Sequence, residues 1–90
     1  MNKKYSHCLF GSVKILNIKL IEYFYSATAE LGENITMELR FMSNLEKVGL
    51  AIKKDTELHF EGYISGDREH GNWIVISDWE LLGDYLVATL

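Results

Sequence analysis

The hydrophobic pattern of this chain has a period of two residues nearly everywhere and changes to a helical period in one short segment. The strictest alternation lies in residues 35–42, where the side chains predicted to face inward are Ile35, Met37, Leu39 and Phe41. Such alternation is typical of half-buried β-strands. Weaker alternation in residues 7–16, 56–65 and 72–82 predicts further strands. The pattern therefore predicts a mainly β domain.

Residues 43–53 form the segment with helical spacing, where the apolar positions are Leu45, Val48 and Ile52. Ser43-Asn44-Leu45-Glu46 has the sequence of a capping box, which predicts Ser43 as the N-cap of a helix. Lys53 and Lys54 follow where cations favour a helix C-terminus. Gly49 lowers the helix propensity, so we expect a short helix that is held by packing.

The first third of the chain is harder to divide into strands. Gly11 lies within the alternation of residues 7–16 and predicts a bulge or a bend there. Beyond Asn17, one predicted face carries Ile18, Leu20 and Phe24, and the other carries Lys19, Ile21, Tyr23 and Tyr25. The pattern leaves open whether residues 7–29 form one bent strand or two. Clearer turn signals lie at residues 32–34 and 66–71.

The alternation in the last two predicted strands indicates which of their side chains face the core and which face solvent. In residues 56–65, the alternation directs Leu58, Phe60 and Ile64 inward and Tyr63 outward. Trp73 and Trp79 are six residues apart and are therefore predicted to share one face of the last strand. Tryptophans in such a strand more often fill a core or a dimer surface than a ligand site. The apolar residues 85–90 are expected to dock on the domain.

Length and charge limit the classes of function. Ninety residues make a single domain, residues 1–90, with one core. The net charge of −4 argues against phosphate binding by bulk electrostatics, so nucleic-acid binding would require a locally basic surface. The lone Cys8 permits neither an internal disulfide nor a thiolate metal site and favours a cytoplasmic location. No apolar run is long enough to span a membrane.

The order of three strands, a helix and two strands is that of a five-stranded OB-like barrel with one short helix between strands 3 and 4. Residues 52–64, from Ile52-Lys53-Lys54 to Gly62-Tyr63-Ile64, and the bulky strand that follows resemble bacterial single-strand-binding proteins and the related primosomal protein. The resemblance covers residues 43–82. It implies an OB fold and a role in binding single strands. The basic, aromatic-rich strand pair of that family is absent from the first half, and no flexible acidic tail follows the barrel.

Aromatic and cationic residues, all but Trp73 on the predicted outer faces, form a candidate site for single-stranded nucleic acid. The candidate residues are Lys14, Lys19, Tyr23, Tyr25, Arg40, Tyr63 and Trp73. Interleaved rings and cations let bases stack while phosphates are neutralised. The alternative is that these tyrosines only reflect strand propensity. Glu22 and Glu38 on neighbouring positions also weaken the positive field.

No constellation of residues specifies a reaction, so we predict no enzyme, no metal site and no cofactor. The sequence supports two functions. The first is a single-stranded nucleic-acid-binding domain accessory to replication or to a mobile element. The second is a small acidic protein-binding module, of the phage-inhibitor or immunity-protein type, with a basic protein partner. An open barrel without proline would leave strand edges exposed, which predicts a homodimer.

Overall fold

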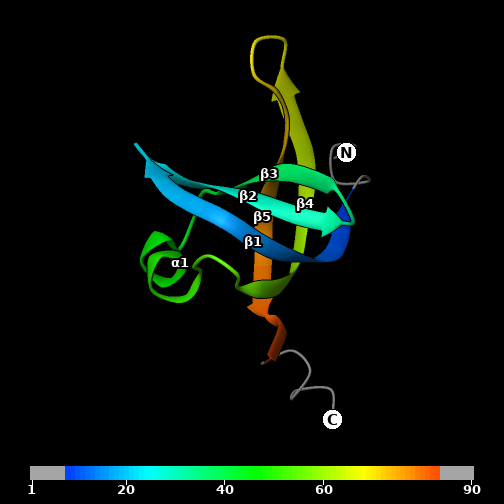
Figure 1. The fold of residues 1–90 in the computed structure, drawn as a ribbon. Helices are drawn as coiled ribbons and strands as arrows, with labels where there is room; N and C mark the ends of the chain where they lie inside the picture. The colour runs from blue at the N-terminus through cyan, green and yellow to red at the C-terminus, as the bar shows by residue number, and fades with distance from the viewer. Residues whose placement is uncertain (1–7, 84–90) are drawn as a thin grey trace.

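The computed structural model describes residues 8–83, which form five strands and one helix (Figure 1). The elements are β1 (Leu9–Ile21), β2 (Phe24–Gly32), β3 (Ile35–Phe41), α1 (Leu45–Ala51), β4 (Glu57–Asp67) and β5 (Gly71–Leu81). The prediction of a mainly β, five-stranded barrel with one short helix between strands 3 and 4 is confirmed. The expected docking of residues 85–90 falls outside the described residues.

The strands close into a barrel in the order β1-β2-β3-β5-β4. Closure depends on β1, which pairs with β4 from Leu9 to Lys14 and with β2 from Lys14 to Ile21. The β3–β5 contact is parallel, whereas the other four contacts are antiparallel. Because the barrel is closed, the open edges from which the homodimer was predicted are absent from its wall. The homodimer stays a prediction without that support.

A bulge at Leu16 allows β1 to pair with two different strands. The register with β2 shifts between Ile15 and Asn17, and a bulge of this kind bends the strand. Backbone hydrogen bonds beside the bulge join Ile15 to the turn before β4, from Asp55 N to Ile15 O (2.6 Å) and from Ile15 N to Thr56 O (2.8 Å). Residues 9–21 are therefore one bent strand, and a second strand follows.

A bulge or a bend was predicted at Gly11, and the bulge is wrong because the pairing of β1 with β4 runs without a shift from Leu9 to Lys14. Gly11 instead lies against the ring of Phe60, which a Cβ atom at this position would approach to 3.2 Å. Gly11 thus reflects a close approach between a ring and the backbone.

A two-residue turn at Glu22–Tyr23 joins β1 to β2, and Ile21 pairs with Phe24 across it. Glu22 has a φ of 51°, in the left-handed region that favours glycine. The turn ends the alternation that the sequence suggested, so the faces assigned to residues 24 and 25 are exchanged. Phe24 faces outward with Ile21, and Tyr25 lies with Leu20 and Phe41 on the side that packs against the core.

A second irregularity separates the two tryptophans. Gly62 pairs with Ile76 whereas Glu61 pairs with Asp78, so Ser77 is the extra residue of a bulge in β5. Because a one-residue bulge exchanges the faces of a strand, Trp73 and Trp79 do not share a face, and the prediction that they do is wrong. Trp79 packs against the core, edge to face with Phe41 at 6.3 Å between ring centroids.

The core fills the barrel, and α1 lies against one end of it (Figure 1). Val48 and Ile52 from the helix segment are buried together with Leu39, Phe41, Leu58 and Phe60. The expected inward positions of Ile35 and Ile64 are wrong, because these side chains are 58% and 55% exposed. Ile64 pairs with the buried Ile74, but β4 has by then passed the end of β1 at Gly62.

The predicted capping box is not formed. The N-cap of α1 is Asn44, which has a left-handed φ of 52° and makes no side-chain capping bond. Its carbonyl accepts the first helical hydrogen bond, from Val48 N at 3.1 Å. The expected role of lysine at the helix C-terminus is seen at Lys53, whose Nζ donates to the Leu50 carbonyl at 2.9 Å.

The ends of β4 and β5 leave the barrel as a two-stranded arm (Figure 1). β5 pairs with β3 only from Trp73 onward, so the arm beyond this point consists of Gly66 opposite Asn72 and Asp67 opposite Gly71. Asp67 closes the tip by accepting a hydrogen bond from His70 N at 2.6 Å. No helix in residues 8–83 is long and apolar enough to cross a membrane.

The first prediction concerns the start of α1. Asn44→Ala should lower the free energy of unfolding by about 1 kcal/mol, because alanine tolerates a left-handed backbone less well than asparagine. Asn44→Gly should be neutral or stabilising. Ser43→Ala should change stability by less than about 0.5 kcal/mol, as expected for an exposed residue without a capping bond. Urea denaturation measures all three. A larger loss for Ser43→Ala than for Asn44→Ala would contradict this assignment of the N-cap.

The second prediction concerns Gly49. Glycine to alanine in a helix normally gains about 1 kcal/mol. Here the new Cβ atom would lie 2.5 Å from Tyr25 Oη, so we expect Gly49→Ala to give no gain. Tyr25→Phe removes the hydroxyl and should restore part of the stability that alanine normally gains over glycine. Gly49→Ala should therefore stabilise the Tyr25→Phe variant. Thermal denaturation of both single variants and the double variant measures the coupling. Equal effects of Gly49→Ala in both backgrounds would disprove the contact.

Candidate nucleic-acid interface

Cross-strand pairing gathers four polar side chains on the outer face of β1, β2 and β3. Lys19 is opposite Ser26, and Ser26 is opposite Arg40. Glu38, two residues before Arg40 on β3, projects from the same face because side chains alternate along a strand. On the other side of β3, Glu38 lies in register with Trp73 of β5. This outer face, with Arg40 at its centre, is called the Arg40 face below.

The guanidinium of Arg40 lies against two aromatic rings. Its central carbon is 3.6 Å from the ring centroid of Trp73 and 4.8 Å from that of Phe24. Since Phe24 is on β2 and Trp73 on β5, the three side chains cross three neighbouring strands of the barrel. Contacts of a cation with aromatic faces are favourable and fix the direction of a long side chain. Arg40 is therefore held in place, and its side chain is only 19% exposed.

Glu38 is the carboxylate partner of Arg40. Its Oε2 accepts hydrogen bonds from Arg40 Nε (2.8 Å) and Ser26 Oγ (2.7 Å), and its Oε1 lies 3.4 Å from Arg40 Nη2. Partial burial acts to raise the pKa of Glu38, but the hydrogen bonds from Arg40 and Ser26 and the Arg40 charge outweigh it and leave that pKa below its usual value. Glu38 is thus ionised at neutral pH and offsets the charge of Arg40.

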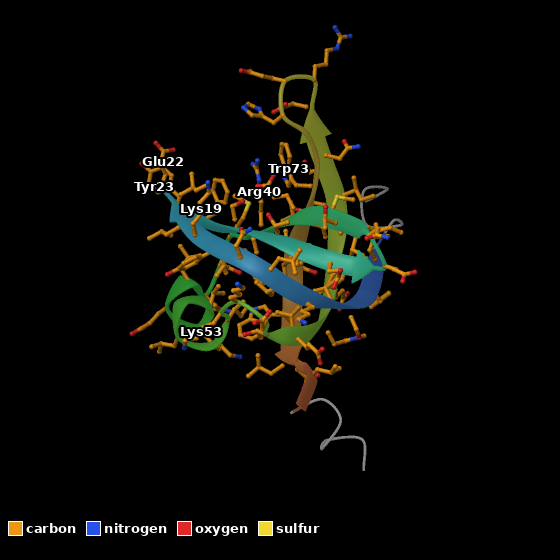
Figure 2. All side chains as sticks on the ribbon, in the orientation of Figure 1. Lys19, Glu22, Tyr23, Arg40, Lys53 and Trp73 are labelled. Atoms are coloured by element: carbon orange, nitrogen blue, oxygen red, sulfur yellow. The ribbon has the colours of Figure 1, made fainter. Side chains whose placement is uncertain are left out.

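A turn and the two-stranded arm flank the Arg40 face (Figure 2). Figure 2 shows Arg40 and Trp73 between the Glu22–Tyr23 turn and the β4–β5 arm. The Tyr23 side chain is 81% exposed at the turn. At the tip of the arm, the backbone hydrogen bond from His70 and then the contact of its ring, with Nδ1 3.1 Å from both carboxylate oxygens, lower the pKa of Asp67.

The structure brings four of the seven predicted site residues onto one surface. Lys19, Arg40 and Trp73 belong to the Arg40 face, and Tyr63 joins them because it pairs with Val75, which lies in register with Arg40. Tyr23 lies at the flanking turn. Lys53, which follows α1, lies on the opposite side of the barrel in Figure 2.

Lys14 and Tyr25 are placed elsewhere. Lys14 lies on β1 about 15 Å from Lys19, by the rise of a strand, and lines an open groove of about 460 Å³ together with Glu30, Glu33 and Glu57. Its charge is therefore surrounded by carboxylates. Tyr25 packs against Gly49 of α1, on the core side of β2.

Phe24 and the partnership of Glu38 with Arg40 are the features that sequence reasoning missed. Phe24 was assigned to the other face because the Glu22–Tyr23 turn contains no glycine, proline or asparagine to mark it. Glu38 was noted only as a diluting charge, although its spacing of two residues from Arg40 on a strand was a usable signal of contact. In residues 8–83, no three His, Cys, Asp or Glu side chains are grouped as metal ligands would be.

Comparison with solved structures decides the fold. A chain of the S. pombe Stn1–Ten1 complex matches with a TM-score of 0.71 and 15% identity over 91% of this chain and 65% of that one. A chain of a Replication Protein A heterotrimer bound to ssDNA matches with a TM-score of 0.71 and 14% identity over 92% of this chain and 63% of that one. The chain has the OB fold.

A third OB-fold match differs in its ligand. A chain from the structure of OBody NL8 bound to hen egg-white lysozyme has a TM-score of 0.68 and 11% identity, over 83% of this chain and 92% of that one. The present chain spans just under two thirds of the length of the first two matches. No protein-family model and no curated protein matches the sequence. Identities of 11–15% establish the shared fold alone.

The third prediction concerns acid stability. Because the pKa of Glu38 is lower in the folded state than its usual value of 4.5, Glu38 stabilises the fold above that pH, and this contribution is lost as the pH falls through the lower folded value. The free energy of unfolding of Glu38→Gln should therefore fall less than that of the wild type between pH 6 and pH 3. Urea denaturation across this range measures the difference. Parallel pH profiles for the two proteins would contradict the assigned ion pair.

Proposed function

We propose that this chain is a single-stranded nucleic-acid-binding OB domain that uses the Arg40 face. The observation that carries the proposal is the position of the aromatic and cationic cluster. It is centred on the outer face of β2 and β3, with Lys19 added from β1 and Trp73 from β5, next to the β1–β2 turn and the β4–β5 arm. OB folds bind oligonucleotides with the corresponding strands and loops.

Each group on the Arg40 face has a role in such binding. Phe24, Trp73 and the exposed Tyr23 offer rings on which bases stack, and stacking is worth about 1–3 kcal/mol per base. Lys19 and the free N–H groups of Arg40 neutralise phosphates. Because Glu38 offsets Arg40 and the whole chain carries a net charge of −4, we expect binding to be modest, in the micromolar range.

The biological setting remains part of the proposal. The resemblance of residues 43–82 to bacterial single-strand-binding proteins supports an accessory role in replication or in a mobile element. The structural match to a chain of a Replication Protein A heterotrimer bound to ssDNA supports the same class of ligand. This chain spans just under two thirds of the first two matches, so the activities of those whole proteins are not carried over to it.

A second candidate function is binding of a basic protein partner. It is favoured by the net charge of −4 and by the groove in which Glu30, Glu33 and Glu57 surround Lys14. The OBody match supports it, because that structure contains an OB-type barrel bound to a protein. The nucleic-acid function ranks first because the aromatic residues gather on the Arg40 face and not beside this groove.

The fourth prediction compares two lysines of the same strand. Lys19→Ala should weaken the binding of a fluorescently labelled dT oligomer about three- to tenfold at low salt and should reduce the salt slope by about 0.7, because one phosphate contact is lost. Lys14→Ala removes the same charge about 15 Å away and should change the affinity less than about twofold. Fluorescence anisotropy measures both.

Equal losses for the two lysine variants would show a nonspecific charge effect and contradict the assigned face. No binding by the wild type at tens of micromolar protein would favour the basic-partner function.

Trp79→Phe leaves Trp73 as the sole tryptophan and gives an independent readout, because a base stacked on Trp73 should quench its fluorescence.

A further inference from the structure

We propose that Glu38 is a built-in competitor for phosphate on Arg40 and is the residue that limits the affinity of the Arg40 face for nucleic acid. This inference rests on the proposed function and names a determinant of it. Glu38 and Arg40 are two residues apart on β3, so the competing carboxylate belongs to the same rigid strand as the cation.

The geometry of the pair supports competition. A guanidinium presents a planar fork of donors that fits two oxygens of a carboxylate or two oxygens of a phosphate equally well. Arg40 uses its Nε and Nη2 on the two oxygens of Glu38, at 2.8 and 3.4 Å. Glu38 therefore occupies the Nε–Nη2 edge of Arg40, one of the two edges at which a backbone phosphate could bind in bidentate fashion.

Displacing this carboxylate is unfavourable for two reasons. Ser26 of β2 also donates to Glu38 Oε2, at 2.7 Å, so the carboxylate is held from a second strand. The rings of Trp73 and Phe24 restrict Arg40 itself. A phosphate must then approach the remaining N–H groups of Arg40 while it lies close to an ionised carboxylate, and like charges at this range repel.

The alternative role of Glu38 is to position Arg40, and the two roles predict opposite effects of the same substitution. Glu38→Gln keeps an oxygen that accepts from Arg40 and Ser26 but removes the negative charge. If Glu38 competes with phosphate, this variant gains affinity. If Glu38 serves only to hold Arg40, the variant gains nothing.

The matched control is Glu57→Gln. It makes the same change in net charge, from −4 to −3, at an exposed position of β4 beside the Lys14 groove. Glu57 is six residues from Tyr63 along β4, about 20 Å at the rise of a strand. This distance is about twice the Debye length at 0.1 M salt, so its charge should have little effect on the Arg40 face.

The experiment is a salt titration of the affinity of wild type, Glu38→Gln and Glu57→Gln for a labelled dT oligomer by fluorescence anisotropy. Glu38→Gln should bind about three- to tenfold more tightly at 0.1 M salt, with a salt slope steeper by about 0.7 for the one phosphate gained. Glu57→Gln should match the wild type. A cooperative thermal unfolding transition in all three proteins confirms that the comparison is between folded barrels.

Three results would overturn the proposal. Equal gains in both variants would show that only net charge matters. Unchanged or weaker binding by Glu38→Gln, with measurable binding by the wild type, would make Glu38 a positioning residue and leave the proposed function standing. No binding by any of the three proteins would remove the nucleic-acid function itself, and the role of Glu38 with it.

Discussion

The fold depends on one strand that pairs with two different neighbours. β1 joins β4 through its first half and β2 through its second half, and the bulge at Leu16 provides the bend between them. The hydrogen bonds from Asp55 N to Ile15 O and from Ile15 N to Thr56 O fix the turn after α1 at that bend. Closure of the barrel and the position of the helix at its end are therefore coupled at a few backbone groups.

The same geometry determines which residues form the Arg40 face. Because the bulge shifts the second half of β1, Lys19 comes opposite Ser26 and so lies two strands from Arg40. The parallel contact of β3 with β5 then adds Trp73 beside Glu38. The cluster contains residues distant in sequence, and it exists only because the barrel closes in this order.

Sequence reasoning predicted the parts of the fold that depend on hydrophobic period. The alternation at Leu39 and Phe41 and the helical spacing of Val48 and Ile52 marked the buried residues correctly. It failed where the backbone departs from regular alternation. The bulge at Ser77 and the turn at Glu22 carry no strong local signal, and each exchanges the faces of the residues that follow.

Among the candidate site residues, the regularity of the strand separates those whose outward or inward face was predicted correctly from those whose face was not. Lys19, Arg40 and Tyr63 were placed outward correctly because their strands alternate regularly around them, whereas Trp73 was wrongly grouped on one face with Trp79. Tyr25 was misplaced because it follows the unrecognised turn. Lys14 is on an outward position, but alternation along a single strand does not reveal that its neighbours are Glu30 and Glu57.

The length of the β4–β5 arm can change without altering the packing of the core. Beyond the pair of Ser65 with Trp73, where the contact of β5 with β3 ends, the arm is held by pairing between its own two strands. Insertion of matched residues on both sides of the tip would extend its reach while every buried contact in the barrel stays the same. The reach of the arm can therefore evolve separately from the stability of the barrel.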